Sequence, residues 1–397
     1  MTDQADLPLQ GIRVLEFTHM LMGPAVGAIL ADMGADVIRI EPIGGDKTRE
    51  LPGSGAGYFL MFNRNKRSIS LDLKTAAGRQ LALDLVATAD ALVENFAPGT
   101  MERLGLGYRD LSALNPRLIY CAEKGFLGGP YEHRAALDEV AQMMGGLAYM
   151  TGPPGRPLRA GASVVDIMGG MFGAIGILAA LEERHRTGLG QKIKSALFED
   201  VVYLMGQHMA QQARTGTAAP PMTVRTAAWA IYDIFSTADG SQVFVGVVSD
   251  AQWQRFCAAF SLTTFGADPA LSSNGARVAR RAEILPVVRE RFGALAKGHL
   301  MEQLEQIGVP FAPINRPEDL WSDPHLLASG GLLATNLPGG GQAGLPALPL
   351  EMKARRFGLR RQPPGPGEHT QEILAELGHG DQAIQSLLEA GIAGGPG

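Results

Sequence analysis

The sequence predicts an α/β protein built around a doubly wound parallel sheet. Two short apolar runs, residues 14–17 and 37–40, have the length of buried strands, and the stretch between them can hold a crossover helix. Further strand-like and helix-like segments alternate after them, which is the order of a doubly wound sheet. Ligands of such sheets bind at the carboxyl ends of the strands, so a site is expected at the Gly23-Pro24 turn after the first strand.

The remaining elements follow from local patterns. The proline-rich residues 218–223 break the alternation and predict a domain boundary. Residues 230–248 read as a β-hairpin, because Asp239-Gly240 is a preferred turn dipeptide. Before residue 218, the other predicted strands are 68–74, 91–94 and 118–123, and the predicted helices are 75–89, 139–149 and 164–186.

Composition restricts the class of protein. The chain has 397 residues, of which 46% are hydrophobic and 19% charged, as expected for a globular protein with a large core. The net charge of −5 and the absence of a long basic run argue against a nucleic-acid partner. Cys121 and Cys257 lie far apart and form no disulfide framework or metal-binding spacing, which favours a reduced, cytoplasmic compartment.

One segment is apolar enough to raise the question of a membrane span. Residues 164–181 are long enough for such a span, but they contain Asp166 and four glycines. Glycines permit close packing of helices, so this segment is expected to be a buried helix of a soluble core. The polar, acidic N-terminus argues against a secretory signal, and no membrane partner is expected.

Several blocks of the chain together carry a family resemblance. Residues 93–99 read Val-Glu-Asn-Phe-Ala-Pro-Gly, and residues 115–120 read Asn-Pro-Arg-Leu-Ile-Tyr. With these blocks the chain resembles the class III CoA-transferases, a family that includes formyl-CoA, carnitine and bile-acid CoA-transferases. The other blocks that carry the resemblance are residues 11–41, 63–74, 103–105, 176–181 and 367–370.

The resemblance implies a particular organisation. A large Rossmann-like domain is expected from both chain ends, residues 1–217 and 326–397, with a smaller α+β domain, residues 224–325, inserted between them. Two chains are expected to form an interlocked homodimer.

The resemblance also implies an activity, the transfer of CoA between small dicarboxylic or hydroxy acids. A carboxylate of the enzyme attacks the thioester of an acyl-CoA, and the CoA thiolate then opens the mixed anhydride. The reaction needs a nucleophilic Asp or Glu, backbone N–H groups for the oxyanions, and cations for the CoA phosphates. The substrates are therefore an acyl-CoA and a small carboxylic acid, and no metal is implied.

The sequence leaves the nucleophile open between two acids. The resemblance leads us to expect the nucleophilic Asp in residues 151–161, but this loop contains no carboxylate. Asp138 is expected at a helix N-terminus, where backbone N–H groups stabilise a carboxylate, and Asp166 begins the glycine-rich apolar helix. Either acid is a candidate catalytic residue, and either could simply cap its helix.

Binding residues follow from the resemblance, position by position. Lys74 and Arg103 are expected to hold CoA phosphates, and Phe96 to face the adenine. Arg156 and Arg159 belong to the loop without a carboxylate and are candidates to bind the substrate's carboxylate, because a guanidinium can do so with two hydrogen bonds. The other expected CoA-binding residues are Leu21, Met22, Leu71, Asn95, Ala97, Lys124, Gly125 and Phe126.

Two other functions remain open at this point. One is an acyl-CoA racemase or lyase of the same superfamily that uses Asp138 and Asp166 as acid and base. Related racemases carry a His just before the position of Asp138, whereas this chain has Leu137, which argues against that chemistry. The other is a non-catalytic CoA-binding subunit of a hetero-oligomer.

Overall fold

The computed structural model describes residues 7–225, 227–353 and 355–396, which form two compact units. Unit 1 contains the described residues up to Thr223 and from Pro324 onward, so both ends of the chain contribute to it. Unit 2 is Val224–Asp323.

Unit 1 is built on a seven-stranded sheet in the order β14-β3-β2-β1-β4-β5-β6. The strands are parallel except for β14, which runs antiparallel to β3. The order reverses between β1 and β4, and this switch point is where doubly wound sheets bind ligands. The strands are β1 (Arg13–Phe17), β2 (Asp36–Glu41), β3 (Arg67–Leu71), β4 (Ala91–Glu94), β5 (Ile119–Lys124), β6 (Lys192–Ala196) and β14 (Ala393–Gly394).

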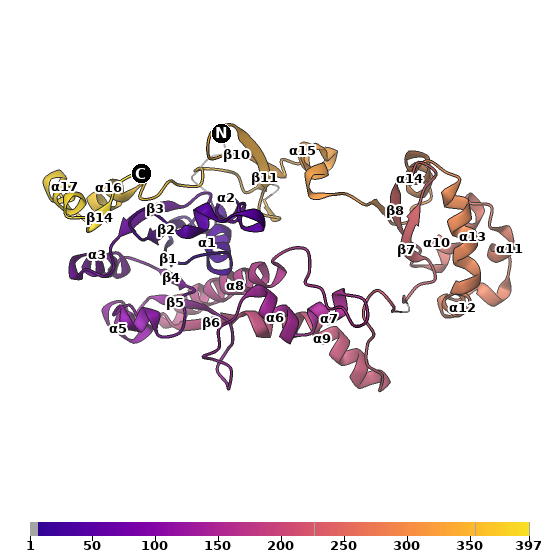
Figure 1. Ribbon diagram of the computed structural model, residues 1–397, viewed down its shortest axis with the longest axis horizontal. Helices are drawn as coiled ribbons and strands as arrows, with labels where there is room; N and C mark the ends of the chain where they lie inside the picture. Colours follow the sequence, from indigo (N-terminus) through magenta and orange to yellow (C-terminus); the bar gives the residue numbers. More distant parts are fainter. Residues whose placement is uncertain (1–6, 226, 354, 397) are drawn as a thin grey trace. The chain divides into compact units, whose positions relative to one another are not determined.

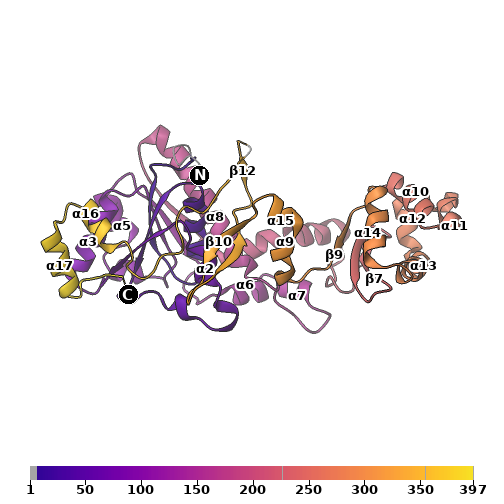
Figure 2. The same cartoon turned by 90° about the horizontal axis from the view of Figure 1, so that it is seen from above.

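Helices cover both faces of this sheet, so the predicted α/β fold class is confirmed (Figures 1 and 2). The strands alternate side chains between two apolar clusters. Leu15 and Tyr120 face one cluster, and Val14 and Cys121 face the other. The first face is covered by α3 (Ala76–Ala87), α5 (Tyr108–Leu114), α16 (Thr370–Glu376) and α17 (Asp381–Glu389), and the second by α1 (Met22–Asp32) and α8 (Val164–Thr187).

One face of the long helix α8 packs closely in this core. A Cβ atom at Gly170 would lie 2.6 Å from the Cβ of Ala25, so only glycine lets α8 approach α1 this closely. Within the described part of the chain, α8 is the one helix whose length and composition would suit a membrane span. It also contacts β5 and β6, as expected for a core helix.

Two sequence predictions for unit 1 need correction. The helix expected at residues 139–149 is two helices, because the chain turns at Gly146 with φ +90°. Strand β6 was not predicted: it lies at the sheet edge, and its sequence Lys-Ile-Lys-Ser-Ala lacks an apolar run. The other elements of this part are α2 (Tyr58–Phe62), α4 (Thr100–Arg103), α6 (Asp138–Met144), α7 (Leu147–Thr151) and α9 (Leu197–Thr215).

The C-terminal part of unit 1 adds two small antiparallel pairs and a helix before the chain returns to the main sheet. These are α15 (Pro324–Ala328), β10 (Leu332–Asn336) paired with β11 (Gln342–Pro346), and β12 (Glu351–Met352) paired with β13 (Arg355–Arg356).

Unit 2 has its own core around Trp253, Phe256 and Phe292. The predicted hairpin is confirmed, with Gly240 at φ +74° in its turn. Its three-stranded sheet is β7 (Tyr232–Ser236), β8 (Gln242–Gly246) and β9 (Phe311–Pro313), and its helices are α10 (Asp250–Ala259), α11 (Thr263–Gly266), α12 (Asn274–Ala279), α13 (Arg281–Gly293) and α14 (Lys297–Gln306).

Candidate active site

The ends of β1 and β4 are tied together at the switch point. The backbone N–H of His19 donates to Oδ1 of Asn95 at 2.9 Å, and Nδ2 of Asn95 donates to the His19 carbonyl at 2.8 Å. The His19 ring stacks on Phe96 with 5.6 Å between centroids. Burial lowers the pKa of His19, so the ring is neutral at neutral pH. We call residues 18–20 the switch-point turn.

A cavity of about 840 Å³ lies on one side of this turn, within the size range of small-molecule sites. Its walls are mostly apolar, and the ammonium groups of Lys47 and Lys74 are exposed at its lining. Of the residues expected to bind CoA, Leu71, Lys74, Phe96 and Ala97 line it.

A second cavity, of about 290 Å³, shares His19 and Met20 with the first. The two cavities therefore meet at the switch-point turn. The second cavity is the one that contains both candidate nucleophiles. Of the expected site residues, it is lined by Leu21, Met22, Asn95, Lys124, Gly125, Asp138, Arg159 and Asp166.

Asp138 is buried and its carboxylate is fully engaged. Oδ2 accepts the backbone N–H groups of Val165 and Asp166 at 2.9 and 3.2 Å, at the start of α8. Oδ1 accepts Nε2 of Gln142 at 2.6 Å and Nη2 of Arg159 at 3.2 Å. Four donors therefore contact the two oxygens of this carboxylate, which anchors the start of α8.

Asp166 lies in the first turn of α8 and is only partly exposed. Among the described residues, none forms a hydrogen bond or ion pair with its carboxylate. Burial, and then the charge of Asp138, raise the pKa of Asp166 to about 7. Asp166 therefore presents an unbonded carboxylate of raised basicity to the smaller cavity.

The two arginines of the 151–161 loop have different surroundings. Nη2 of Arg159 contacts Asp138, and Nη1 donates to Oε1 of Glu139 at 3.1 Å. Nε of Arg159 is buried with no partner among the described residues, and the side chain as a whole is 32% exposed. Arg156 is exposed and belongs to the lining of neither cavity.

The end of β5 contributes backbone to the smaller cavity. Nζ of Lys124 donates to Oε2 of Glu94 at 2.6 Å and to the Phe96 carbonyl at 2.8 Å, which joins the ends of β4 and β5. A Cβ atom at Gly125 would lie 2.4 Å from the Cβ of Ala136, so this position requires glycine. Lys124 therefore acts mainly on the protein, and Gly125 keeps backbone close to the cavity.

Two of the expected CoA-binding residues lie outside both linings. Arg103 is exposed, and its Nη2 donates to Oγ1 of Thr100, which does line the larger cavity. Phe126 is 2% exposed and packs against Tyr131 and Phe198. Arg103 therefore lies next to a residue of the larger cavity's lining, whereas Phe126 is part of the core.

Sequence reasoning passed over one acid of the site, Glu123. It lines the smaller cavity at the end of β5, and burial raises its pKa to about 8. Its Oε1 accepts the Cys121 thiol at 3.1 Å, and its Oε2 has no partner among the described residues. The available signal was an acidic residue that ends an apolar strand.

Known proteins match this chain over nearly its whole length. A sequence profile of CoA-transferase family III matches residues 9–370. The chain is 36% identical to the succinate–glutarate CoA-transferase of Agrobacterium fabrum, over 95% of this chain and 98% of the relative. It is 33% identical to the human succinyl-CoA:glutarate CoA-transferase, over 97% of this chain and 90% of the relative.

Solved structures show the same fold. A CAIB/BAIF family protein from Brucella suis has a TM-score of 0.82 and 35% identity, covering 94% of this chain and all of that one. A protein from Mycobacterium tuberculosis has a TM-score of 0.81 and 28% identity, covering 93% and 99% of the two chains. The family profile and the relatives extend over nearly the whole chain, and the chain is therefore an enzyme that belongs to CoA-transferase family III.

Proposed function

We propose that this enzyme moves CoA between small dicarboxylic acids and that Asp166 is its nucleophile. One observation carries the choice of nucleophile. Four acids line the smaller cavity, and Asp166 is the one whose two carboxylate oxygens are both free of hydrogen bonds and ion pairs among the described residues. The other three are Glu123, Asp138 and Glu139.

The first half of the reaction follows from that carboxylate. An oxygen of ionised Asp166 attacks the thioester carbonyl carbon, the C–S bond breaks, and CoA leaves as a thiolate. The thiolate then attacks the Asp166 carbonyl of the mixed anhydride. The donor acid departs as a carboxylate, and the enzyme is left as a thioester between Asp166 and CoA.

The second half reverses these steps with another acid. The carboxylate of the acceptor attacks the Asp166 thioester and releases CoA thiolate, which attacks the acyl carbon of the new anhydride. Acceptor acyl-CoA forms, and Asp166 returns as a carboxylate. Atoms and charge balance without a metal or redox group. The backbone at Gly125 lies in the same cavity and is placed to stabilise the oxyanions.

The raised pKa of Asp166 supports this role. A carboxylate of higher basicity is a stronger nucleophile once it is ionised, and at neutral pH a large fraction of Asp166 is ionised. Asp138 helps because it holds the start of α8 by two backbone N–H groups and contributes negative charge next to Asp166.

Arg159 supports the preference for dicarboxylic acids. It lines the smaller cavity and its side chain is 32% exposed, so its guanidinium can donate a hydrogen bond to the distal carboxylate of an acyl group. The names of the relatives from Agrobacterium and human both specify succinyl or succinate and glutarate, which are dicarboxylic. The larger cavity is assigned to the nucleotide end of CoA, with Phe96 and His19 beside the adenine and Lys74 and Arg103 near phosphates.

We further propose that the enzyme is a cytoplasmic homodimer. Apolar side chains on α6 to α9 of unit 1 are exposed in the single chain, which is unfavourable unless another surface covers them. Cys121 and Cys257 are free and buried, which suits a reducing compartment. The exposed apolar residues are Met143, Met144, Tyr149, Met171, Ile175, Tyr203 and Met209.

The function is tested by transfer from succinyl-CoA to a panel of acids, followed by chromatography of the CoA esters. We expect transfer to glutarate and similar diacids, loss of about 10³-fold or more in kcat for Asp166→Asn, and a much smaller loss for Asp138→Asn. Rejection of every acid, with exchange of α-protons for deuterium, would instead identify a racemase. CoA binding with neither reaction would identify a non-catalytic subunit.

A further inference from the structure

The switch-point turn contains a residue in an unusual backbone conformation. Met20 has φ +58°, in the left-handed region that residues other than glycine seldom adopt. It sits between the two cavities and lines both. Unfavourable backbone conformations persist where the surroundings enforce them, and they are frequent at functional sites.

Thr48 forms a hydrogen bond with the backbone of Met20. It lies in a short 3₁₀ helix, Lys47–Glu50, and is 3% exposed. Its Oγ1 accepts the backbone N–H of Met20 at 3.0 Å. The hydroxyl in turn donates to Oδ1 of Asp46 at 2.9 Å, so its orientation is fixed with the lone pair toward Met20.

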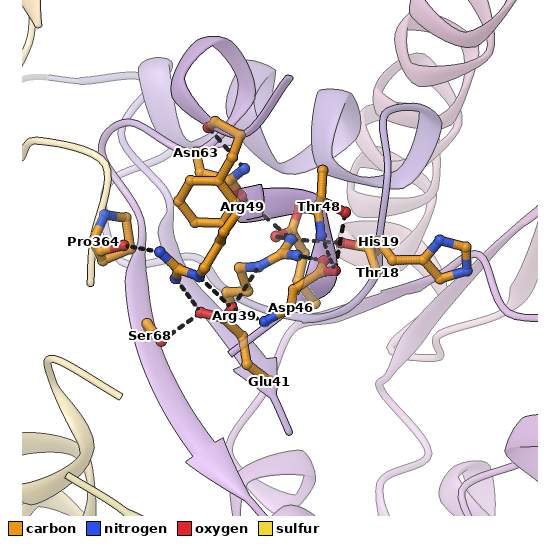
Figure 3. A network of polar contacts seen from close by, with 12 residues as sticks. Thr18, His19, Arg39, Glu41, Asp46, Thr48, Arg49, Asn63, Ser68 and Pro364 are labelled. Carbon is orange, nitrogen blue, oxygen red and sulfur yellow. Dashed lines mark hydrogen bonds and ion pairs between the residues drawn. The ribbon is translucent and has the colours of Figure 1, made fainter. Parts of the chain in front are cut away.

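A buried guanidinium anchors both sides of this arrangement. Arg39 on β2 is fully buried, and its Nη2 pairs with Oδ2 of Asp46. Its Nη1 donates to Oγ1 of Thr18 at 3.2 Å, at the other end of the turn (Figure 3). Arg39 thus contacts Thr18 directly, and it is linked to Met20 through Asp46 and Thr48.

We propose that Thr48 is a positioning residue: it holds Met20 in the left-handed conformation, and the turn so shaped directs the pantetheine arm of CoA from the larger cavity to Asp166. The proposal rests on the assignment of the two cavities given under Proposed function. Thr48 lines only the larger cavity and is not among the residues that line the smaller one, so it acts on the thioester through the turn.

The first test compares Thr48→Val and Thr48→Ser with the wild-type enzyme. Valine keeps the shape and removes the acceptor, whereas serine keeps the hydroxyl. For Thr48→Val we expect kcat for succinyl-CoA and glutarate to fall about 10-fold, because small misplacement of reacting groups is costly, while the Kd of free CoA changes less than about 3-fold. Thr48→Ser should restore most of kcat.

Thr370→Val is the matched control. Thr370 is also buried, and its Oγ1 also accepts a backbone N–H, that of Ser70 at 3.2 Å, but it lines neither cavity. Both valine variants should lower the melting temperature, and only Thr48→Val should lower kcat. Equal kcat for the two variants, or a serine variant as slow as the valine variant, would overturn the proposal.

The second test uses Met20→Gly, since glycine adopts positive φ freely. If Thr48 acts by holding this conformation, Thr48→Val should cost less in kcat when glycine is at position 20 than in the wild-type background. An equal cost in both backgrounds would contradict the proposal. These outcomes differ from failure of the proposed function, in which the wild-type enzyme itself transfers no CoA from succinyl-CoA.

Discussion

The carboxylate of Asp138 accepts the backbone N–H of Asp166 at 3.2 Å, so one acid of the smaller cavity helps to hold the start of the helix that carries the other. The two carboxylates therefore have different roles although they lie close together. Four hydrogen-bond donors contact the carboxylate of Asp138, and its charge helps to raise the pKa of Asp166. Asp166 has no such partners, and burial together with that charge raises its pKa.

This relationship predicts the pH dependence of transfer. The reactive form of Asp166 is ionised, and its pKa is raised to about 7, so kcat/KM should rise through pH 7 and level off above it. At pH 5.5 the loss should be about 30-fold relative to the plateau. In the Asp138→Asn enzyme the rise of kcat/KM should occur at lower pH, because a negative neighbour of Asp166 has been removed. A rise at the same pH in both enzymes would show that Asp138 does not act on the titrating group.

Arg159 should decide between classes of acid. Arg159→Ala should lower kcat/KM for glutarate about 10-fold more than for a monocarboxylate such as butyrate, because a charge-assisted hydrogen bond is lost only for the diacid. Arg156→Ala is the control: it belongs to the same loop but is exposed and outside both cavities. Equal losses for both acid types in the Arg159 variant would remove Arg159 from substrate selection.

Lys74 and Arg103 should affect CoA and not the acid. Each alanine variant should raise the KM for acyl-CoA about 10-fold at low ionic strength, and the effect should shrink as salt is added. Arg109→Ala, an exposed arginine on α5 that lines neither cavity, is the control. A KM unchanged at low salt would place the tested cation away from the phosphates.

Glu123 makes the stability of the protein depend on pH. Burial raises its pKa to about 8, above the ordinary value of 4.5. Between these values the folded protein holds a proton that the unfolded chain releases, so the stability contributed by this group falls as pH rises, by up to about 1.4 kcal/mol per pH unit.

The variant Glu123→Gln removes this titration while keeping the shape of the side chain. The melting temperature of the variant minus that of the wild-type protein should therefore be higher at pH 8 than at pH 5. Thermal unfolding followed by circular dichroism at both pH values measures the difference. A difference independent of pH would mean that Glu123 is not protonated in the folded protein at pH 5.

Much of the fold was accessible from the sequence because its central strands are buried on both faces. Runs such as Val14–Phe17 are apolar for that reason, and five strands of the large sheet were placed correctly. Strand β6 was missed because an edge strand half exposed to solvent carries lysines at alternate positions. The break at Gly146 was missed because helix periodicity continues across it.

The site was less accessible, since its chemistry depends on contacts between distant segments. Asp138 and Asp166 looked alike as acids at helix starts, and only the four hydrogen bonds to Asp138 separate them. Arg156 and Arg159 looked alike as loop arginines, and only the backbone path of the loop turns Arg159 toward Asp138. No local pattern reports such hydrogen bonds.

The most direct test of Asp166 as the nucleophile is chemical trapping of the enzyme-bound acyl group. The enzyme is incubated with succinyl-CoA and hydroxylamine, digested, and analysed by mass spectrometry for a hydroxamate. We predict that the modified residue is Asp166 and that the modification is absent from the Asp166→Asn enzyme but present in the Asp138→Asn enzyme. A hydroxamate on Asp138, or on Glu123 or Glu139, would contradict the assignment.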